Sequence, residues 1–135
     1  MSATDAFFDT NVLLYLLSDD SAKADRAEEL LASGGRVSVQ VLNEFASVAT
    51  RKLAMSMSEV RDILSTVRSV CAVMPLDVET HDLGLDLAER YRFSIYDALI
   101  VAAASRAGCT VVYSEDFQDG QAIEGLTIRN PFAAA

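Results

Sequence analysis

Short apolar runs alternate along the chain with longer segments whose apolar residues recur at helical spacing. The runs cover residues 6–8, 36–39, 72–74, 110–113 and, more weakly, 126–128, and they predict strands. The longer segments predict helices over residues 12–17 and 22–32 and a third helix that ends at about Lys52. Three more are predicted from Ser56 to about Val70, over 78–91, and from Ser94 to Gly108. Strands that alternate with helices pair in parallel. We therefore expect an α/β fold in one domain over residues 1–135: a parallel sheet of four or five short strands, flanked by helices on both faces.

Short polar side chains mark where these helices begin. Ser21 is the expected N-cap of the helix over 22–32, and Asp77 that of the helix over 78–91. Ser56 and Ser94 each precede an acidic residue by three positions, which is the spacing of a capping box.

Four acidic residues coincide with the ends or buried faces of these elements. Asp9 follows the first strand directly, and Asp116 comes just after the strand over 110–113. Asp97 lies in the first turn of a helix that is almost wholly apolar, and Glu44 lies among apolar residues in the middle of a helix. Ligands of parallel sheets bind outside the carboxyl ends of the strands. These four side chains are therefore the candidate site.

Each acid alone also has an ordinary structural interpretation. Asp9 fits an Asx turn or a helix cap, Asp97 the acid of a capping box, Glu44 the edge of an amphipathic helix and Asp116 a turn. Together, however, converging carboxylates repel one another unless a cation joins them. A site of carboxylates without imidazole or thiolate favours Mg²⁺ or Mn²⁺, and such a site suits phosphoryl-transfer chemistry.

Composition narrows the classes of function. Apolar residues make up 51% of the chain and charged residues 23%, which excludes general disorder. His81 is the single histidine, and Cys71 and Cys109 lie far apart, so paired-histidine mechanisms and Cys or His zinc sites are excluded. No apolar run approaches the roughly 20 residues of a membrane span, and the first residues lack the basic start of a signal peptide. We therefore expect a cytoplasmic protein. The net charge of −9 argues against a broad basic surface for nucleic acid.

Four segments in this order resemble a known family. They cover residues 7–13, 41–45, 94–100 and 113–117, and each contains one of the four acids. Over nearly its whole length the chain resembles the PIN-domain nucleases, in particular the VapC-like ribonuclease toxins of type II toxin–antitoxin systems. The resemblance implies a homodimer that cleaves RNA with one or two Mg²⁺ or Mn²⁺ ions, and an antitoxin protein as partner.

The resemblance also implies roles for individual residues. The metal-binding and catalytic acids are Asp9, Glu44, Asp97 and Asp116. Asn11 and Ser114 match supporting polar positions, and Asp119 is an alternative to Asp116 as the fourth acid. Apart from the resemblance, the shortage of basic residues suggests that few arginines contact RNA, and Arg51, Arg90 and Arg92 are the candidates near the crevice, although each alone also fits a solvated surface position.

Two other functions remain open from the sequence. One is a non-catalytic PIN-like module that binds nucleic acid or another protein. The other is a haloacid-dehalogenase-like phosphatase, whose D-x-D pattern is interrupted here because Asn11 stands where the second acid is required. The RNA target is not predicted by any residue.

Overall fold

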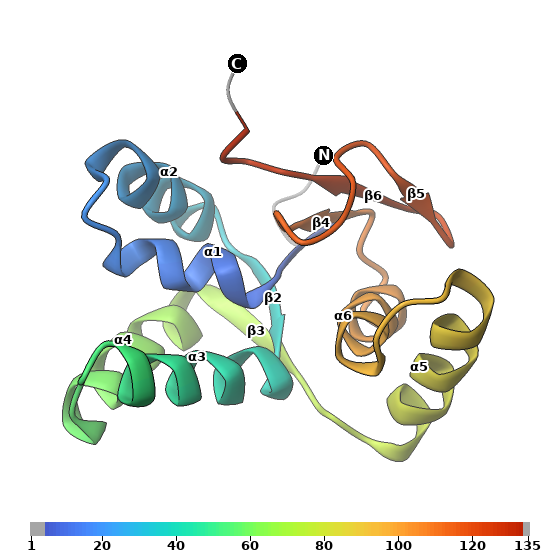
Figure 1. The fold of residues 1–135 in the computed structure, drawn as a ribbon, viewed down its shortest axis with the longest axis horizontal. Coiled ribbons are helices and arrows are strands. Elements are labelled where there is room, and N and C mark those ends of the chain that lie inside the picture. Colours follow the sequence, from blue (N-terminus) through green and yellow to red (C-terminus); the bar gives the residue numbers. More distant parts are fainter. Residues whose placement is uncertain (1–4, 134–135) are drawn as a thin grey trace.

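Six short strands form one sheet in the computed structural model, which describes residues 5–133 (Figure 1). They are β1 (Ala6–Phe8), β2 (Gly35–Ser38), β3 (Cys71–Met74), β4 (Val111–Tyr113), β5 (Ala122–Ile123) and β6 (Leu126–Arg129). Their order across the sheet is β3-β2-β1-β4-β6-β5, and every neighbouring pair is parallel except β5 with β6. The predicted parallel α/β architecture is confirmed. The two-residue β5 is an additional antiparallel edge strand that is too short to leave a sequence pattern.

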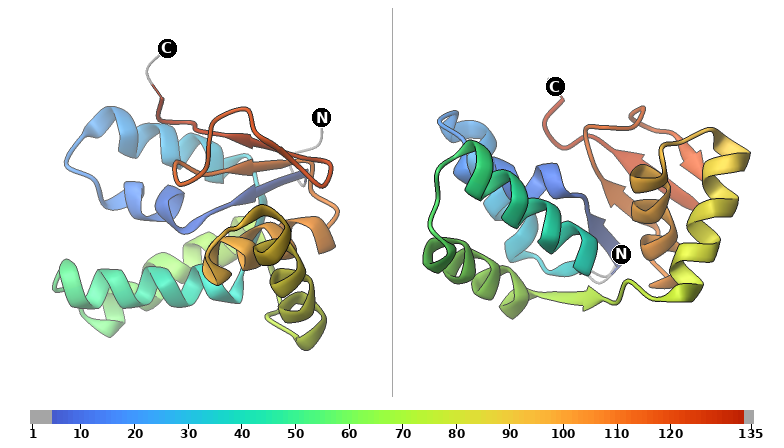
Figure 2. Two further views of the ribbon diagram at one scale, coloured as in Figure 1. Left: turned by 45° about the vertical axis from the view of Figure 1, so that its right-hand side comes forward. Right: turned by 60° about the horizontal axis from the view of Figure 1, so that its bottom comes forward.

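Helices connect the parallel strands. They are α1 (Thr10–Leu14), the 3₁₀ turn η2 (Tyr15–Leu17), α2 (Ser21–Ala32), α3 (Val39–Lys52), α4 (Met57–Val70), α5 (Val78–Tyr91) and α6 (Ile95–Arg106). Figures 1 and 2 show α3 beside α4, and α5 against α6. The segment predicted as one short helix over 12–17 is divided between α1 and η2.

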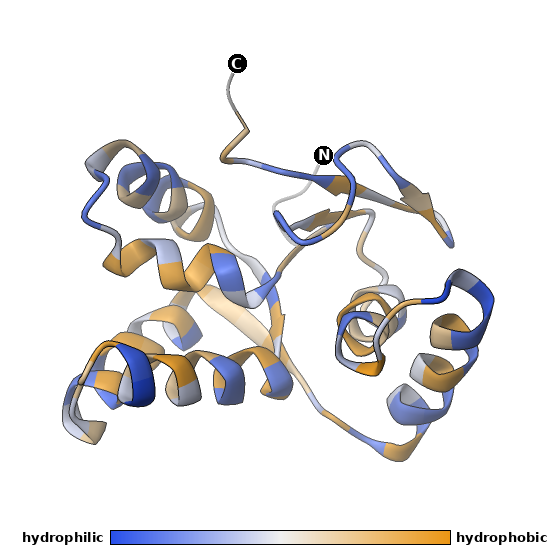
Figure 3. Ribbon diagram, in the orientation of Figure 1, coloured by the Kyte–Doolittle hydropathy of each residue, from blue (hydrophilic) through white to orange (hydrophobic). Residues whose placement is uncertain are grey.

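The core lies between the strands and the apolar faces of the helices. In α6, all seven residues from 98 to 104 are buried, so this helix is enclosed on every side. In α3, Val41, Phe45 and Ala49 are buried at helical spacing, and the alternating colours of this helix in Figure 3 show the resulting two faces. The buried elements therefore fix where the ends of β1, α3 and α6 meet.

The start of α2 differs from the prediction. The helix begins at Ser21, and its N-cap is Asp20, whose carboxylate accepts hydrogen bonds from the N–H groups of Ala22 and Lys23. The prediction of Ser21 as the cap is wrong because Ser21 is already helical. At α4 the capping box of Ser56 and Glu59 is confirmed, with both of its hydrogen bonds present.

The strand predicted over 36–39 is shifted by one residue. Val39 is the first residue of α3, because the hydroxyl of Ser38 accepts from the N–H of Val41 and caps the helix. At the other end, β2 begins at Gly35, where an added Cβ would lie 2.6 Å from the ring of Phe8. A glycine is thus required for β2 to approach β1.

Two further observations concern the cysteines and the lengths of the helices. Cys71 and Cys109 are both buried and form no disulfide, and burial raises the pKa of each thiol to about 11. Over residues 5–133, no helix has the length and apolar character needed to cross a membrane.

Candidate active site

Asp9 lies at the junction of β1 and α1, where the chain leaves the sheet. One oxygen of its carboxylate caps α1 by accepting from the N–H of Thr10 (2.7 Å). The other accepts from the hydroxyl of Ser114 (2.6 Å), which follows β4. Because Phe8 pairs with Tyr113 in the parallel register, Asp9 and Ser114 emerge side by side at the carboxyl ends of neighbouring strands. Asp9 is 4% exposed, so its carboxylate is held almost entirely inside the protein.

Ser114 and Asn11 join Asp116 to Asp9. The amide nitrogen of Asn11 donates to Asp116 Oδ2 (3.2 Å) and to Ser114 Oγ (3.3 Å), and Ser114 Oγ also accepts from the N–H of Asp116 (3.1 Å). A hydroxyl has one donor and two acceptor positions, and the fully buried Ser114 uses all three. The structure therefore brings Asn11 and Ser114 together with two of the predicted acids.

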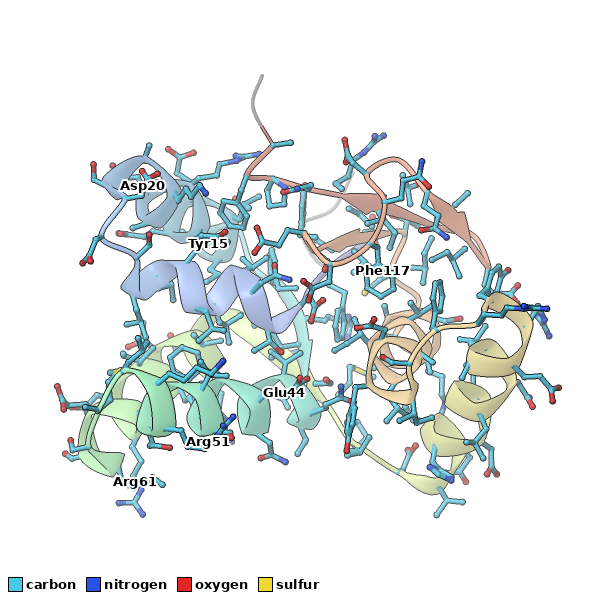
Figure 4. The ribbon with its side chains drawn as sticks, in the orientation of Figure 1. Tyr15, Asp20, Glu44, Arg51, Arg61 and Phe117 are labelled. Carbon is cyan, nitrogen blue, oxygen red and sulfur yellow. The ribbon has the colours of Figure 1, made fainter. Side chains whose placement is uncertain are left out.

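Glu44 approaches from α3. Its Oε1 accepts from the hydroxyl of Thr10 (3.3 Å) and from the amide nitrogen of Gln40 (3.0 Å). Thr10 follows Asp9 directly, so the first of these hydrogen bonds links Glu44 to the end of β1. In Figure 4, Glu44 lies near the start of α3, which is the end of this helix closest to α6.

Asp97 approaches from the first turn of α6 and is half-buried. Burial raises the pKa of its carboxyl, the charge of Asp116 raises it further, a hydrogen bond with Ser94 lowers it, and the charge of Glu44 raises it. Asp97 therefore shares an electric field with the acids that come from β4 and α3.

The pKa of Asp9 is raised as well, and burial is the main cause. Burial raises the pKa of Asp9 to about 7, against the lowering by the hydrogen bonds from Ser114 and Thr10, and the charges of Asp116 and Glu44 add to the rise. Four carboxylates from four segments thus repel one another across a partly buried space. This repulsion is relieved by a proton or by a cation.

The donor set fits a hard divalent cation in its chemistry. All four side chains offer oxygen, which suits Mg²⁺ or Mn²⁺, and the raised pKa of the buried Asp9 shows that negative charge is poorly compensated there. In the part of the chain that the structure describes, no three Asp, Glu, His or Cys side chains are grouped closely enough to hold a metal ion as they stand. Binding would therefore require the carboxylates to move together.

Asp119 lies outside the cluster of acids. Its Oδ1 accepts from the N–H of Asn130 (2.8 Å), which follows β6, so its side chain holds the loop between β4 and β5 against the end of the sheet. Asp116, in contrast, is bonded to Asn11 beside Asp9. Of the two alternatives for the fourth acid, the geometry favours Asp116.

The three candidate arginines differ in their surroundings. Arg51 is exposed near the end of α3, donates to Ser47 Oγ (2.9 Å), and lines the same cavity as Glu44. Arg90 forms an ion pair with Glu124 in the turn between β5 and β6. Arg92 is the exposed, left-handed C-cap of α5. Arg51 is therefore the arginine of the three that shares a cavity with a candidate acid.

Several residues around the cavity beside Glu44 were not predicted from the sequence to belong to the site. This cavity measures about 500 Å³ and is lined by Gln40, Asn43, Glu44, Ser47, Arg51, Leu76, Tyr96 and Leu99. Gln40, Ser47 and Arg51 follow one another at helical spacing on the face of α3 that carries Glu44, a signal that the sequence does contain. The place of Tyr96 on α6 depends on long-range packing.

Comparisons with solved structures find the same fold in several toxin–antitoxin proteins. A chain of a toxin–antitoxin complex from Klebsiella pneumoniae has a TM-score of 0.72 at 19% identity, covering 96% of this chain and 99% of that one. The sarcin–ricin-loop-cleaving toxin VapC20 of Mycobacterium tuberculosis has a TM-score of 0.67 at 19% identity, covering 82% and 89%. A chain of VapBC2 from Rickettsia felis, bound to a promoter DNA fragment, has a TM-score of 0.66 at 16% identity, covering 93% and 97%.

At the level of sequence, the comparisons point the same way. No curated protein matches the chain. The model of the PIN domain matches residues 6–118, a segment that contains all four candidate acids. This match argues against the alternative of a haloacid-dehalogenase-like phosphatase. Together with the shared fold, it shows that the chain belongs to the PIN domain family.

Proposed function

We propose that this PIN domain is an endoribonuclease that depends on Mg²⁺ or Mn²⁺ and acts as the VapC-like toxin of a toxin–antitoxin pair. The observation that supports this most strongly is the set of carboxylates outside the ends of β1 and β4, in which burial and the charges of Asp116 and Glu44 raise the pKa of both Asp9 and Asp97. The family match and the similarity in fold to VapC20, a toxin that cleaves the sarcin–ricin loop, add support for RNA as the substrate.

In this proposal, one or two cations are held by Asp9, Glu44, Asp97 and Asp116. A divalent cation supplies positive charge that activates water and offsets the charge on the attacked phosphodiester. The protein supplies orientation. Ser114 holds one oxygen of Asp9, and Asn11 holds one oxygen of Asp116. Burial of Asp9 excludes water from the inner side of the site and strengthens its interaction with any cation.

The cavity beside Glu44 offers a path for single-stranded RNA. Arg51 lies about two turns of helix beyond Glu44 along α3, so a phosphate of a strand that enters the site can approach its guanidinium. Tyr96, next to Asp97, is 65% exposed and presents an aromatic ring on which a base can stack. We assign the RNA contact to this cavity and not to Arg90 or Arg92.

An antitoxin and a second copy of the chain complete the proposed partners, in a cytoplasmic setting where RNA is accessible. Solved structures of the same fold include toxin–antitoxin complexes. A second copy of the chain could pack against α5, where Val78 is 70% exposed and Leu85 is 49% exposed. These two residues lie seven positions apart on one face of the helix and form an apolar surface that suits an interface.

Light scattering of the purified chain measures its oligomeric state directly. A monomer at micromolar concentration, with Val78→Asp unchanged, would contradict the dimer.

A non-catalytic binding module is the second candidate function. It is favoured by one observation: over residues 5–133 the acids are not grouped as a ready-made metal site. This candidate predicts binding to RNA or protein without cleavage, whichever cation is added.

Mapping of RNA 5′ ends in cells after induction distinguishes the two candidates. We expect the wild-type chain to generate new 5′ ends at defined sites, and Asp9→Asn, expressed at the same level, to generate none. Asparagine keeps the size of the side chain but removes the charge that a cation requires.

The antitoxin provides a second arm of the same experiment. Co-expression with the protein encoded beside it should suppress both the new 5′ ends and the growth defect. If wild type and Asp9→Asn give the same 5′ ends, the endoribonuclease assignment is wrong.

A further inference from the structure

Gln40 is a buried polar side chain that connects two of the elements that carry acids. It lies in the first turn of α3, four residues before Glu44, and is 6% exposed. Its amide nitrogen donates to Glu44 Oε1 (3.0 Å) and to the backbone oxygen of Tyr96 (3.0 Å) in the first turn of α6. Asp97 is the next residue. One amide group therefore ties Glu44 to the start of the helix that carries Asp97.

The same side chain includes an unfavourable feature. The oxygen of the Gln40 amide is buried without a hydrogen-bond partner among the described residues. An unpaired buried carbonyl oxygen destabilises a fold, because it has lost its bonds to water without replacement. A methionine or leucine at this position would fill similar space without this cost.

Neither acceptor depends on Gln40 for a partner. Glu44 Oε1 also accepts from the hydroxyl of Thr10, and in a regular helix the backbone oxygen of Tyr96 accepts from the N–H four residues later. Removal of the Gln40 amide would therefore leave both acceptors bonded and eliminate the unpaired oxygen. Stability of the fold does not explain why a glutamine is present.

Orientation of Glu44 does explain it. The two donors, from Gln40 and Thr10, both bind Oε1, which fixes the carboxylate and leaves Oε2 for another ligand. Without the donor from Gln40, only the longer hydrogen bond from Thr10 (3.3 Å) would hold Oε1, and repulsion from Asp97 and Asp9 would favour conformations in which Glu44 turns into the solvent of the adjoining cavity. A flexible glutamate must then be ordered again each time a cation binds.

We propose that Gln40 is a positioning residue that holds the Glu44 carboxylate toward Asp97, so that the acids can bind a divalent cation. This inference rests on the proposed function, since it assigns Gln40 a role in the cation site of that function. It predicts that the Gln40 amide contributes to cation affinity and not to the stability of the cation-free fold.

The test compares Gln40→Met with wild type in two measurements. Isothermal titration with Mn²⁺ should show roughly 10- to 100-fold weaker binding to the variant, as is typical when a partner of a metal ligand is removed. Thermal unfolding in EDTA should show a melting temperature equal to that of wild type or higher. Gln121→Met, at a half-buried position just before β5, is the matched control and should change neither.

Three results would overturn the inference. The first is Mn²⁺ binding to Gln40→Met with the affinity of wild type. The second is a melting temperature in EDTA that falls by several degrees for both Gln40→Met and Gln40→Leu, which would show a structural role. The third is a wild-type chain that binds no Mn²⁺, which would contradict the proposed function itself. The first two leave the function intact, because RNA cleavage by wild type is measured separately.

Discussion

Ser114 and Asp9 show how single residues build this site. Ser114 is fully buried, and its one hydroxyl donates to Asp9 and accepts from Asn11 and from the N–H of Asp116. Asp9 in turn accepts from Thr10 and Ser114 and is held where its charge is unfavourable. The hydrogen bonds thus stabilise a carboxylate that burial destabilises, which is the electrostatic state that a cation would relieve.

The raised pKa of Asp9 predicts an unusual pH dependence of stability. Its ordinary pKa is 3.8, and in the folded protein the pKa is about 7. Between these values the folded state binds a proton that the unfolded state does not bind. The contribution of Asp9 to stability is therefore fully present below pH 4 and is lost as the pH rises through about 7. In EDTA, wild type should gain about 2–3 kcal/mol relative to Asp9→Asn between about pH 7.5 and about pH 5.

Urea unfolding of the two proteins at both pH values measures this difference. Comparison with Asp9→Asn is necessary because the chain carries a net charge of −9, and acid lowers the repulsion among all its carboxylates in both proteins. A constant difference in unfolding free energy across this pH range would show that Asp9 is ionised normally in the fold.

How much of the site the sequence predicts depends on the residue. Asp9 and Asp116 stand out because each follows a strand, and Asp97 because it opens an apolar helix. The structure brings these three and Glu44 into one electric field. Gln40 could not be singled out, because a glutamine on an amphipathic helix looks solvated until the packing of α6 over it is known.

At the scale of elements, local patterns in the sequence predicted where the helices and strands lie. They did not always predict the residues at which these elements begin and end. Apolar runs located β1 to β4 and β6, while β5 needs β6 beside it to be a strand at all. The order of strands in the sheet depends on long-range packing. The end of β2 also differs from the prediction, because Ser38 caps α3 and so ends the strand one residue earlier than predicted.

The cap of α2 provides a direct test at this scale. Asp20 accepts from two backbone N–H groups of the first turn, whereas Ser21 is the first residue of the helix. We expect Asp20→Ala to lower the unfolding free energy by about 1 kcal/mol, because those two donors lose their partner. Ser21→Ala, the matched control, should stay within about 0.5 kcal/mol of wild type. Chemical denaturation measures both, and the opposite ranking would restore Ser21 as the cap.

At the scale of the whole molecule, the net charge of −9 acquires a different meaning. With the four candidate acids set aside, 16 acidic residues face 11 basic ones, a formal charge of −5. Two divalent cations would offset the charge of the four acids. RNA binding should therefore depend on divalent cations and on few arginines such as Arg51, not on a general basic surface.

The central claim is that the four acids and a divalent cation perform RNA cleavage. The measurement that tests it most directly is the rate at which purified protein cleaves a single-stranded RNA of mixed sequence. Cleavage by wild type should require Mg²⁺ or Mn²⁺ and stop in EDTA. Asp97→Asn, with an unchanged circular dichroism spectrum, should be slower by at least about 100-fold. Asp119→Asn is the matched control and should cleave as wild type does, because Asp119 binds Asn130 outside the cluster. Cleavage by Asp97→Asn at the wild-type rate, or cleavage that persists in EDTA, would contradict the account.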